Sequence, residues 1–142
     1  MMLNLTMNFD GGCYPNPGGK MTFGWHTDTE DYRRVAEGNG TIQGYDDHER
    51  TNNTAEFTAL LAGLEWVAQY RLHAIDTLVI RGDSKLVVDT VKGDMKLKKP
   101  HLLPLRDACR NAINEIDAGH IELLWVPREQ NTKADLLAGT AS

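Results

Sequence analysis

The stretch LNLTMNFDGG, residues 3–12, carries the strongest structural signal in the chain. Apolar and polar side chains alternate strictly over residues 3–9, which is the period-2 pattern of a β-strand with one buried face. Asp10 continues the polar face, and the glycines after it begin a cluster of turn-forming residues that extends to Gly19. The stretch therefore predicts a strand that ends on an acidic side chain.

Alternating patterns near residues 21–28 and 32–42 predict two more strands, which would complete a meander. Asn53 then stands three residues before Glu56, at the head of an apolar pattern with helical spacing. Asn53 is expected to cap this helix, and the spacing of Glu56 also fits the reciprocal half of a capping box, which is the alternative to a role in a site. The remaining predicted elements are a strand at 78–80 that leads into Gly82-Asp83-Ser84, a helix at 86–91 stopped by Gly93, a helix at 104–118 closed by Gly119, a strand at 121–126, and a terminal helix capped by Asn131.

This order of elements predicts an α/β protein. Three consecutive strands can pair as antiparallel neighbours, whereas strands joined through helices run parallel. The 142 residues contain no repeat, linker or low-complexity segment, so residues 1–142 are expected to form one domain. The tryptophans at positions 25, 66 and 125 are expected to face the core.

The overall charge is acidic, with 20 Asp and Glu against 15 Lys and Arg and a net charge of −5. That balance argues against coating nucleic acid through bulk positive charge. No apolar run approaches the ~20 residues of a membrane span, and the start of the chain lacks the pattern of a secretory signal. A cytoplasmic protein without a membrane partner is expected, with Cys13 and Cys109 as free thiols.

Four acids stand at or near predicted element ends: Asp10, Glu56, Asp83 and Asp135. Each alone is explained by a turn, a cap or a helix dipole. Together they point to a site, because ligands of α/β sheets collect at the carboxyl ends of the strands. Converging carboxylates repel one another unless cations neutralise them, and Mg²⁺ or Mn²⁺ suits oxygen ligands. Two such ions about 4 Å apart can promote displacement at phosphorus.

Four motifs together resemble the type 1 ribonuclease H family over essentially the whole chain. They are DGGCYPNPGG at 10–19, TNNTAE at 51–56, GDS at 82–84 and WVPREQNTKAD at 125–135. The resemblance implies a ribonuclease H-like five-stranded mixed sheet, three antiparallel strands then two parallel, flanked by helices. It also implies an endonuclease that uses two metal ions to hydrolyse the RNA strand of RNA–DNA hybrids, leaving 5′-phosphate and 3′-hydroxyl ends.

The same resemblance implies roles for individual residues. The acids at positions 10, 56, 83 and 135 match the metal-binding catalytic carboxylates of the family. Thr51 matches a residue in the pocket for a DNA phosphate. Short amide side chains and loop N–H groups can contact a ribose 2′-hydroxyl without recognising sequence. The positions that match hybrid contacts are Cys13, Asn16, Asn52 and Asn53.

The chain departs from many members of the family in two places. The loop at 127–130 is short and holds no histidine; Arg128 can reach a phosphate there, and His48 is the nearest candidate substitute, although an exposed surface histidine is expected. A basic insertion of the family is reduced here to residues 92–99. Residues 85–99 still hold five lysines against two aspartates, a net +3. The lysines predicted to contact phosphates are Lys85, Lys96, Lys98 and Lys99, the alternative being a solvated surface.

Two other classes of function stay open at this point. One is another nuclease of the same fold, such as an exonuclease or a junction resolvase. An exonuclease would place Asp and Glu two residues apart, whereas Asp10 is followed by two glycines. The other is a catalytically inactive nucleic-acid-binding module, which would have no chemical reason to keep four repelling carboxylates. The expected partner is an RNA–DNA hybrid, and the protein is expected to act as a monomer.

Overall fold

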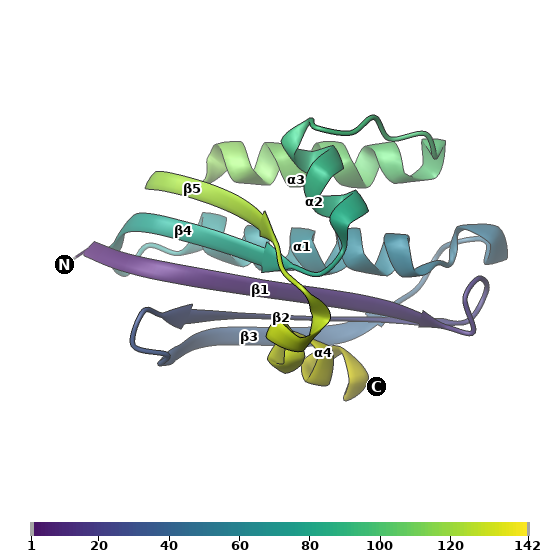
Figure 1. Cartoon of the computed structure of the whole chain (residues 1–142), viewed down its shortest axis with the longest axis horizontal. Coiled ribbons are helices and arrows are strands. Elements are labelled where there is room, and N and C mark those ends of the chain that lie inside the picture. Colours follow the sequence, from purple (N-terminus) through teal and green to yellow (C-terminus); the bar gives the residue numbers. More distant parts are fainter. Residues whose placement is uncertain (1, 142) are drawn as a thin grey trace.

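The computed structural model describes residues 2–141 and arranges them as a sheet with helices on both faces (Figure 1). The strands are β1 (Met2–Tyr14), β2 (Lys20–Thr29), β3 (Arg34–Ile42), β4 (Ala74–Gly82) and β5 (Ala118–Trp125). The helices are α1 (Asn52–Gln69), α2 (Lys85–Lys92), α3 (Leu103–Glu115) and α4 (Thr132–Gly139). Short 3-10 turns lie at Asp47–Glu49, Pro100–Leu102 and Arg128–Gln130. Within residues 2–141, no helix has the length and apolar character needed to cross a bilayer.

The sheet has the order β3-β2-β1-β4-β5. The strands β1, β2 and β3 pair as an antiparallel meander, and β4 and β5 run parallel to β1. The predicted mixed sheet of three antiparallel strands followed by two parallel strands is therefore confirmed. Phe9 of β1 pairs with Gly82 of β4, so the residues that follow each of them lie at the same edge of the sheet.

The helices cover both faces of the sheet, and β2 shows which helix lies on which face. Trp25 packs against Trp66 of α1, with ring centroids 5.8 Å apart. The neighbouring residue, Gly24, faces α4, where a Cβ atom would lie 2.5 Å from the amide nitrogen of Ala138. Because successive residues of a strand point to opposite faces, α1 and α4 lie on opposite faces of the sheet. The alternating apolar residues of β1 pack on the α1 side, where Leu5, Met7 and Phe9 are almost completely buried.

The prediction that the first strand ends near Asp10 is wrong, because β1 continues through both glycines to Tyr14. Tyr14 still pairs with Lys20 of β2. Gly11 lies directly against α1, and a Cβ atom there would overlap the carbonyl group of Ala55. The missing side chain lets the strand pass under the helix in regular pairing, so Gly11 serves a close approach instead of a turn.

The predicted N-cap of the first long helix is also wrong. The helix begins at Asn52, and Thr51 caps it by accepting a hydrogen bond on Oγ1 from the amide of Thr54, at 3.3 Å. Asn53 therefore lies inside the first turn. Glu56 has no capping role in this arrangement, which leaves its carboxylate available to the interior.

Gly119 does not close the helix before it, contrary to the sequence prediction. The helix α3 ends at Glu115, and Ile116 is already extended. Gly119 lies inside β5, since Ala118 pairs with Ile75 of β4. Gly93, by contrast, ends α2 as predicted, with a φ of 91° that favours glycine.

Substituting Gly11 with alanine is expected to lower the free energy of unfolding by about 3 kcal/mol, because the new methyl group would force β1 and α1 apart. Gly12→Ala is the matched control, since a Cβ atom at Gly12 meets no atom within 4 Å. Urea denaturation of the two variants measures the difference. Equal stabilities for both variants would contradict the close packing of β1 under α1.

Candidate active site

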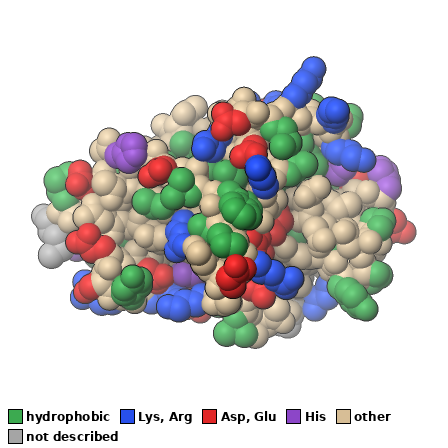
Figure 2. Space-filling view, viewed as in Figure 1, with side chains coloured by type: hydrophobic (Ala, Val, Ile, Leu, Met, Phe, Trp, Pro, Cys, Tyr) green, Lys and Arg blue, Asp and Glu red, His purple; other side chains and the backbone are tan. Residues whose placement is uncertain are grey.

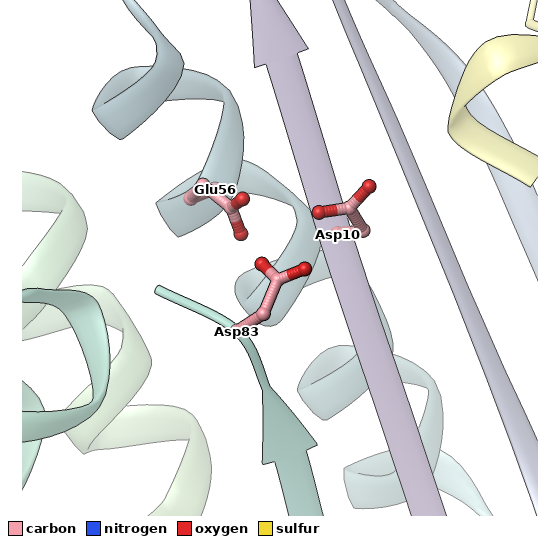
Figure 3. Close-up of side chains that lie close together, drawn as sticks. All are labelled: Asp10, Glu56 and Asp83. Carbon is pink, nitrogen blue, oxygen red and sulfur yellow. The ribbon is translucent and has the colours of Figure 1, made fainter. Parts of the chain in front are cut away.

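Three carboxylates meet at the point where β4 ends beside β1. Asp10 comes from β1, Glu56 from the second turn of α1, and Asp83 from the position directly after β4. One oxygen from each side chain lies within 4.8 Å of the other two. Figure 3 shows the three side chains pointing toward one another from these three elements. The predicted convergence of these three acids is thus seen in the structure.

Backbone geometry brings the three acids together. The parallel pair Phe9–Gly82 places Asp10 and Asp83 side by side at the edge of the sheet. Gly11 allows the backbone of α1 to approach β1 closely at Ala55. Since Glu56 is the next residue of that helix, the same close approach brings its carboxylate to the aspartates.

The electrostatics of the cluster favour the neutral acids. The pKa of Asp10 rises from 3.8 to about 8, mainly through burial, with further contributions from hydrogen bonding to Asp135 and from the charge of Asp83. Burial also raises the pKa of Asp83. A raised pKa means that an ionised carboxylate is unfavourable here unless a positive charge accompanies it.

Glu56 shows most clearly that the cluster is suited to a cation. Its side chain is almost completely enclosed, and only 7% of the residue is exposed. Burial, followed by the charges of Asp10 and Asp83, raises its pKa well above the ordinary value. Its Oε2 atom is buried and has no hydrogen-bond partner in the described part of the chain. A hard divalent ion such as Mg²⁺ or Mn²⁺ would satisfy this oxygen and offset the repulsion, so the residues present fit a metal centre.

Asp135 of α4 stands at the open side of the cluster. It is not one of the three acids whose oxygens converge, but it lines the same cavity, of about 380 Å³. Its carboxylate is partly exposed, and its Oδ2 lies 3.7 Å from a guanidinium nitrogen of Arg128, which also lines the cavity. The structure therefore gathers all four predicted acids around one cavity, three as a compact group and the fourth beside them.

Three of the predicted hybrid-contact residues are joined by hydrogen bonds. Asn52 accepts a bond from the amide of Cys13 at 2.8 Å, and Asn16 accepts one from the amide of Asn52 at 3.1 Å. Asn52 also lines the carboxylate cavity. The thiol of Cys13 is buried and donates to the carbonyl of Arg50 at 3.2 Å. These bonds fix the loop after β1 against the start of α1, at the mouth of the cavity.

The lysines that are predicted to contact phosphates are all exposed, and most of them follow α2. Lys85 opens α2, two residues after Asp83, and residues 93–99 lead from the end of α2 to the 3-10 turn before α3. Figure 2 shows basic side chains projecting from the upper right edge of the molecule, where Figure 1 places this connection. The lysines of this connection are therefore accessible to solvent. His48 is likewise exposed, with 76% of its side chain accessible, as expected for a surface histidine.

Sequence reasoning missed the contacts of two residues, one at the end of β5 and one before α4. Trp125 was expected in the core, but 49% of it is exposed and its indole N–H donates to the carbonyl oxygen of Asp83 at 3.1 Å. Asn131 was expected to cap α4, yet its side chain makes no capping bond. It is buried and donates instead to the carbonyl oxygen of Phe9 at 2.8 Å. Periodicity alone gives no signal for either contact.

The sheet order, together with a carboxylate cluster where β4 ends beside Asp10 of β1, defines a ribonuclease H-like fold. The model of the reverse transcriptase-like family matches residues 8–141. The crystal structure of RNase H1 from Halobacterium salinarum superposes with a TM-score of 0.83, at 35% identity over 97% of this chain and 96% of that one. The N-terminal RNase H domain of Rv2228c from Mycobacterium tuberculosis gives the same TM-score, at 34% identity over 98% and 93% of the two chains.

The chain belongs to the type 1 ribonuclease H family. It is 37% identical to Ribonuclease HI of Halobacterium salinarum over 94% of its own length, and it spans 61% of the length of that relative. It spans 35% of the bifunctional protein Rv2228c. LC11-RNase H1, from a compost metagenome, has been solved in complex with an RNA/DNA hybrid and superposes with a TM-score of 0.80 at 26% identity.

Proposed function

We propose that this protein is a metal-dependent endonuclease that hydrolyses the RNA strand of RNA–DNA hybrids and leaves 5′-phosphate and 3′-hydroxyl ends. The observation that carries the proposal is the meeting of three carboxylates from separate elements, with a buried oxygen of Glu56 that lacks a partner within residues 2–141. Family membership supports it, as does the relative that was solved with an RNA/DNA hybrid.

Asp10, Glu56 and Asp83 would hold the metal, and Asp135 would complete the set at the open side of the cavity. Divalent ions bound there would act as Lewis acids that activate water and stabilise a leaving oxygen. The protein residues would bind the ions and control their surroundings. Burial excludes bulk water from Asp10 and Glu56, which strengthens their attraction for a cation. Because these carboxylates must ionise to bind a metal, binding releases protons. We propose that the site binds two ions, either Mg²⁺ or Mn²⁺.

Substrate recognition is assigned to the residues around the cavity mouth. Asn16, Asn52 and the backbone of Cys13 form one hydrogen-bonded unit that would face the hybrid. Asn53 would contact the same duplex, and Thr51 would contribute to a phosphate pocket. Arg128 would contact a phosphate, since its side chain is 79% exposed beside the cavity. The assignment of residues 1–142 to one domain, the cytoplasmic location and the monomeric state stay predictions from the sequence.

A cleavage assay with an internally labelled RNA strand tests the proposal. The purified protein is expected to cut this RNA at internal positions in a hybrid with DNA when Mg²⁺ or Mn²⁺ is present, and to stop when EDTA is added. Single-stranded RNA and duplex DNA are the control substrates. Products released one nucleotide at a time from an end would favour an exonuclease, and binding of the hybrid without cleavage would favour the inactive module.

Neutralising Lys96, Lys98 and Lys99 with glutamine is expected to weaken hybrid binding and to reduce its dependence on salt. Each phosphate contact contributes about one unit to the slope of log affinity against log salt, so the slope should fall by up to about 3. Hybrid binding measured between about 50 and 200 mM salt gives the slope. Arg33→Gln, on the turn between β2 and β3, is the control and should leave the slope unchanged. An unaltered slope in the triple variant would assign these lysines to the solvated surface.

A further inference from the structure

The segment Trp125–Asn131 runs from the last residue of β5 to the residue before α4, and its side chains bond to the backbone at two of the clustered acids. We propose that Trp125 and Asn131 are positioning residues for the metal site, acting through the backbone next to Asp83 and Asp10. The inference rests on the proposed function, since it concerns the same carboxylates. It is carried by two side-chain hydrogen bonds to backbone carbonyl groups, one to Asp83 itself and one to Phe9, the residue before Asp10.

Trp125 acts on Asp83. The pairing of β4 with its neighbours ends at Gly82, which is opposite Trp125 in β5. Asp83 thus lies beyond the last strand pair, and Ser84 already caps α2 by accepting a bond from the amide of Val87. The indole N–H of Trp125 reaches across this short connection and donates to the carbonyl oxygen of Asp83 at 3.1 Å. This bond orients the peptide that carries the carboxylate.

Asn131 acts on Asp10 in the same way. Its amide nitrogen donates to the carbonyl oxygen of Phe9 at 2.8 Å, and this carbonyl belongs to the peptide bond that leads into Asp10. The other end of the side chain accepts a bond from Asn8 at 2.9 Å, which fixes its orientation. Only 1% of Asn131 is exposed, so both bonds are shielded from water.

The exposure of Trp125 favours a positioning role over a packing role. With 49% of the residue in solvent, its ring contributes much less to the core than Trp25, of which 7% is exposed. The bond to Asp83 supplies a reason for an indole at this place. Removal of a group that orients a metal ligand lowers metal affinity or activity by about 10- to 100-fold. The segment would therefore set the separation of Asp10 and Asp83 before any metal binds.

The first test is Trp125→Phe, which keeps an aromatic ring and removes the N–H donor. Calorimetric titration with Mn²⁺ alone, without nucleic acid, is expected to show about 10-fold weaker binding than in the unchanged protein. At subsaturating Mn²⁺ and saturating hybrid, kcat should fall by a similar factor, while KM for the hybrid stays within about twofold. Trp66→Phe is the matched control. It is the same substitution, made at a half-buried tryptophan of α1 that lies away from the site.

The second test compares Asn131→Ala with Asn8→Ala. The first substitution removes the bonds to both Phe9 and Asn8, whereas the second removes only the bond between the two asparagines. Both variants are expected to lose stability, so both are measured at a temperature at which circular dichroism shows them folded. Asn131→Ala is expected to weaken Mn²⁺ binding about 10-fold and Asn8→Ala by less than about threefold.

Several results would overturn the inference. Mn²⁺ affinity unchanged within twofold in Trp125→Phe, or an equal loss in Trp66→Phe, would remove the role of Trp125. A higher KM for the hybrid with unchanged Mn²⁺ affinity would make Trp125 a substrate contact instead. If the unchanged protein binds Mn²⁺ but cuts no hybrid, the proposed function fails, while the comparison of Mn²⁺ affinities still decides the positioning role.

Discussion

Asp83→Asn is expected to lower kcat for hybrid cleavage by at least about 10³-fold, equivalent to about 4 kcal/mol of lost transition-state stabilisation, and to leave the fold intact. Asp10→Asn is expected to do the same. The asparagine side chain keeps the size of the aspartate but has no charge to hold a cation. Because the pKa values of both carboxyl groups are raised mainly by burial, the substitutions also remove the free-energy cost of burying an ionisable group and should stabilise the metal-free protein at neutral pH.

The measurement is single-turnover cleavage of a labelled hybrid at saturating protein, with circular dichroism to verify the fold. Asp76→Asn is the matched control, since this exposed aspartate lies on β4 near the end opposite to Asp83. It should cleave at the rate of the unchanged protein. An Asp83→Asn variant that retains more than a tenth of the rate would contradict the assignment of this carboxylate to the catalytic metal site.

The second large effect concerns stability and pH in the absence of metal. Asp10 has an ordinary pKa of 3.8 and a pKa of about 8 in the folded protein, where burial is the main cause of the rise. Between these values the folded protein keeps a proton that the unfolded chain releases. The stability of the folded protein is therefore greatest, as far as Asp10 is concerned, below about pH 4, and this contribution is lost as the pH rises toward 8. For one group, the free energy of unfolding falls by at most about 1.4 kcal/mol per pH unit.

Urea denaturation in EDTA at a series of pH values measures this slope, and Asp10→Asn should flatten it. Asp76→Asn should keep it. Added Mg²⁺ or Mn²⁺ should stabilise the protein most at the high end of the range, because the ions bind the ionised carboxylates. Identical slopes for the unchanged protein and for Asp10→Asn would show that Asp10 keeps an ordinary pKa.

Local pattern was enough to predict the order of the elements and the acids. The alternation over residues 3–9 placed the polar side of β1, including Asp10, opposite to the core face, and the structure has this arrangement. Short connections favoured an antiparallel meander, and helical connections favoured parallel strands, which is the observed sheet. The ends of elements were less predictable. Glycine marked a turn by composition, whereas Gly11 serves close packing against Ala55, a contact between residues far apart in the chain.

The sequence by itself determined the class of fold and identified four acids whose repulsion requires a cation, because burial periodicity and charge are properties of short segments. Only the tertiary structure decided that Asp10, Glu56 and Asp83 form the compact group, with Asp135 beside it. It also decided that Trp125 is exposed and that Asn131 bonds to β1 instead of capping α4. The reason is physical: periodicity indicates which face of a segment is buried, but the partner of a polar side chain depends on which distant backbone groups packing brings within hydrogen-bond distance.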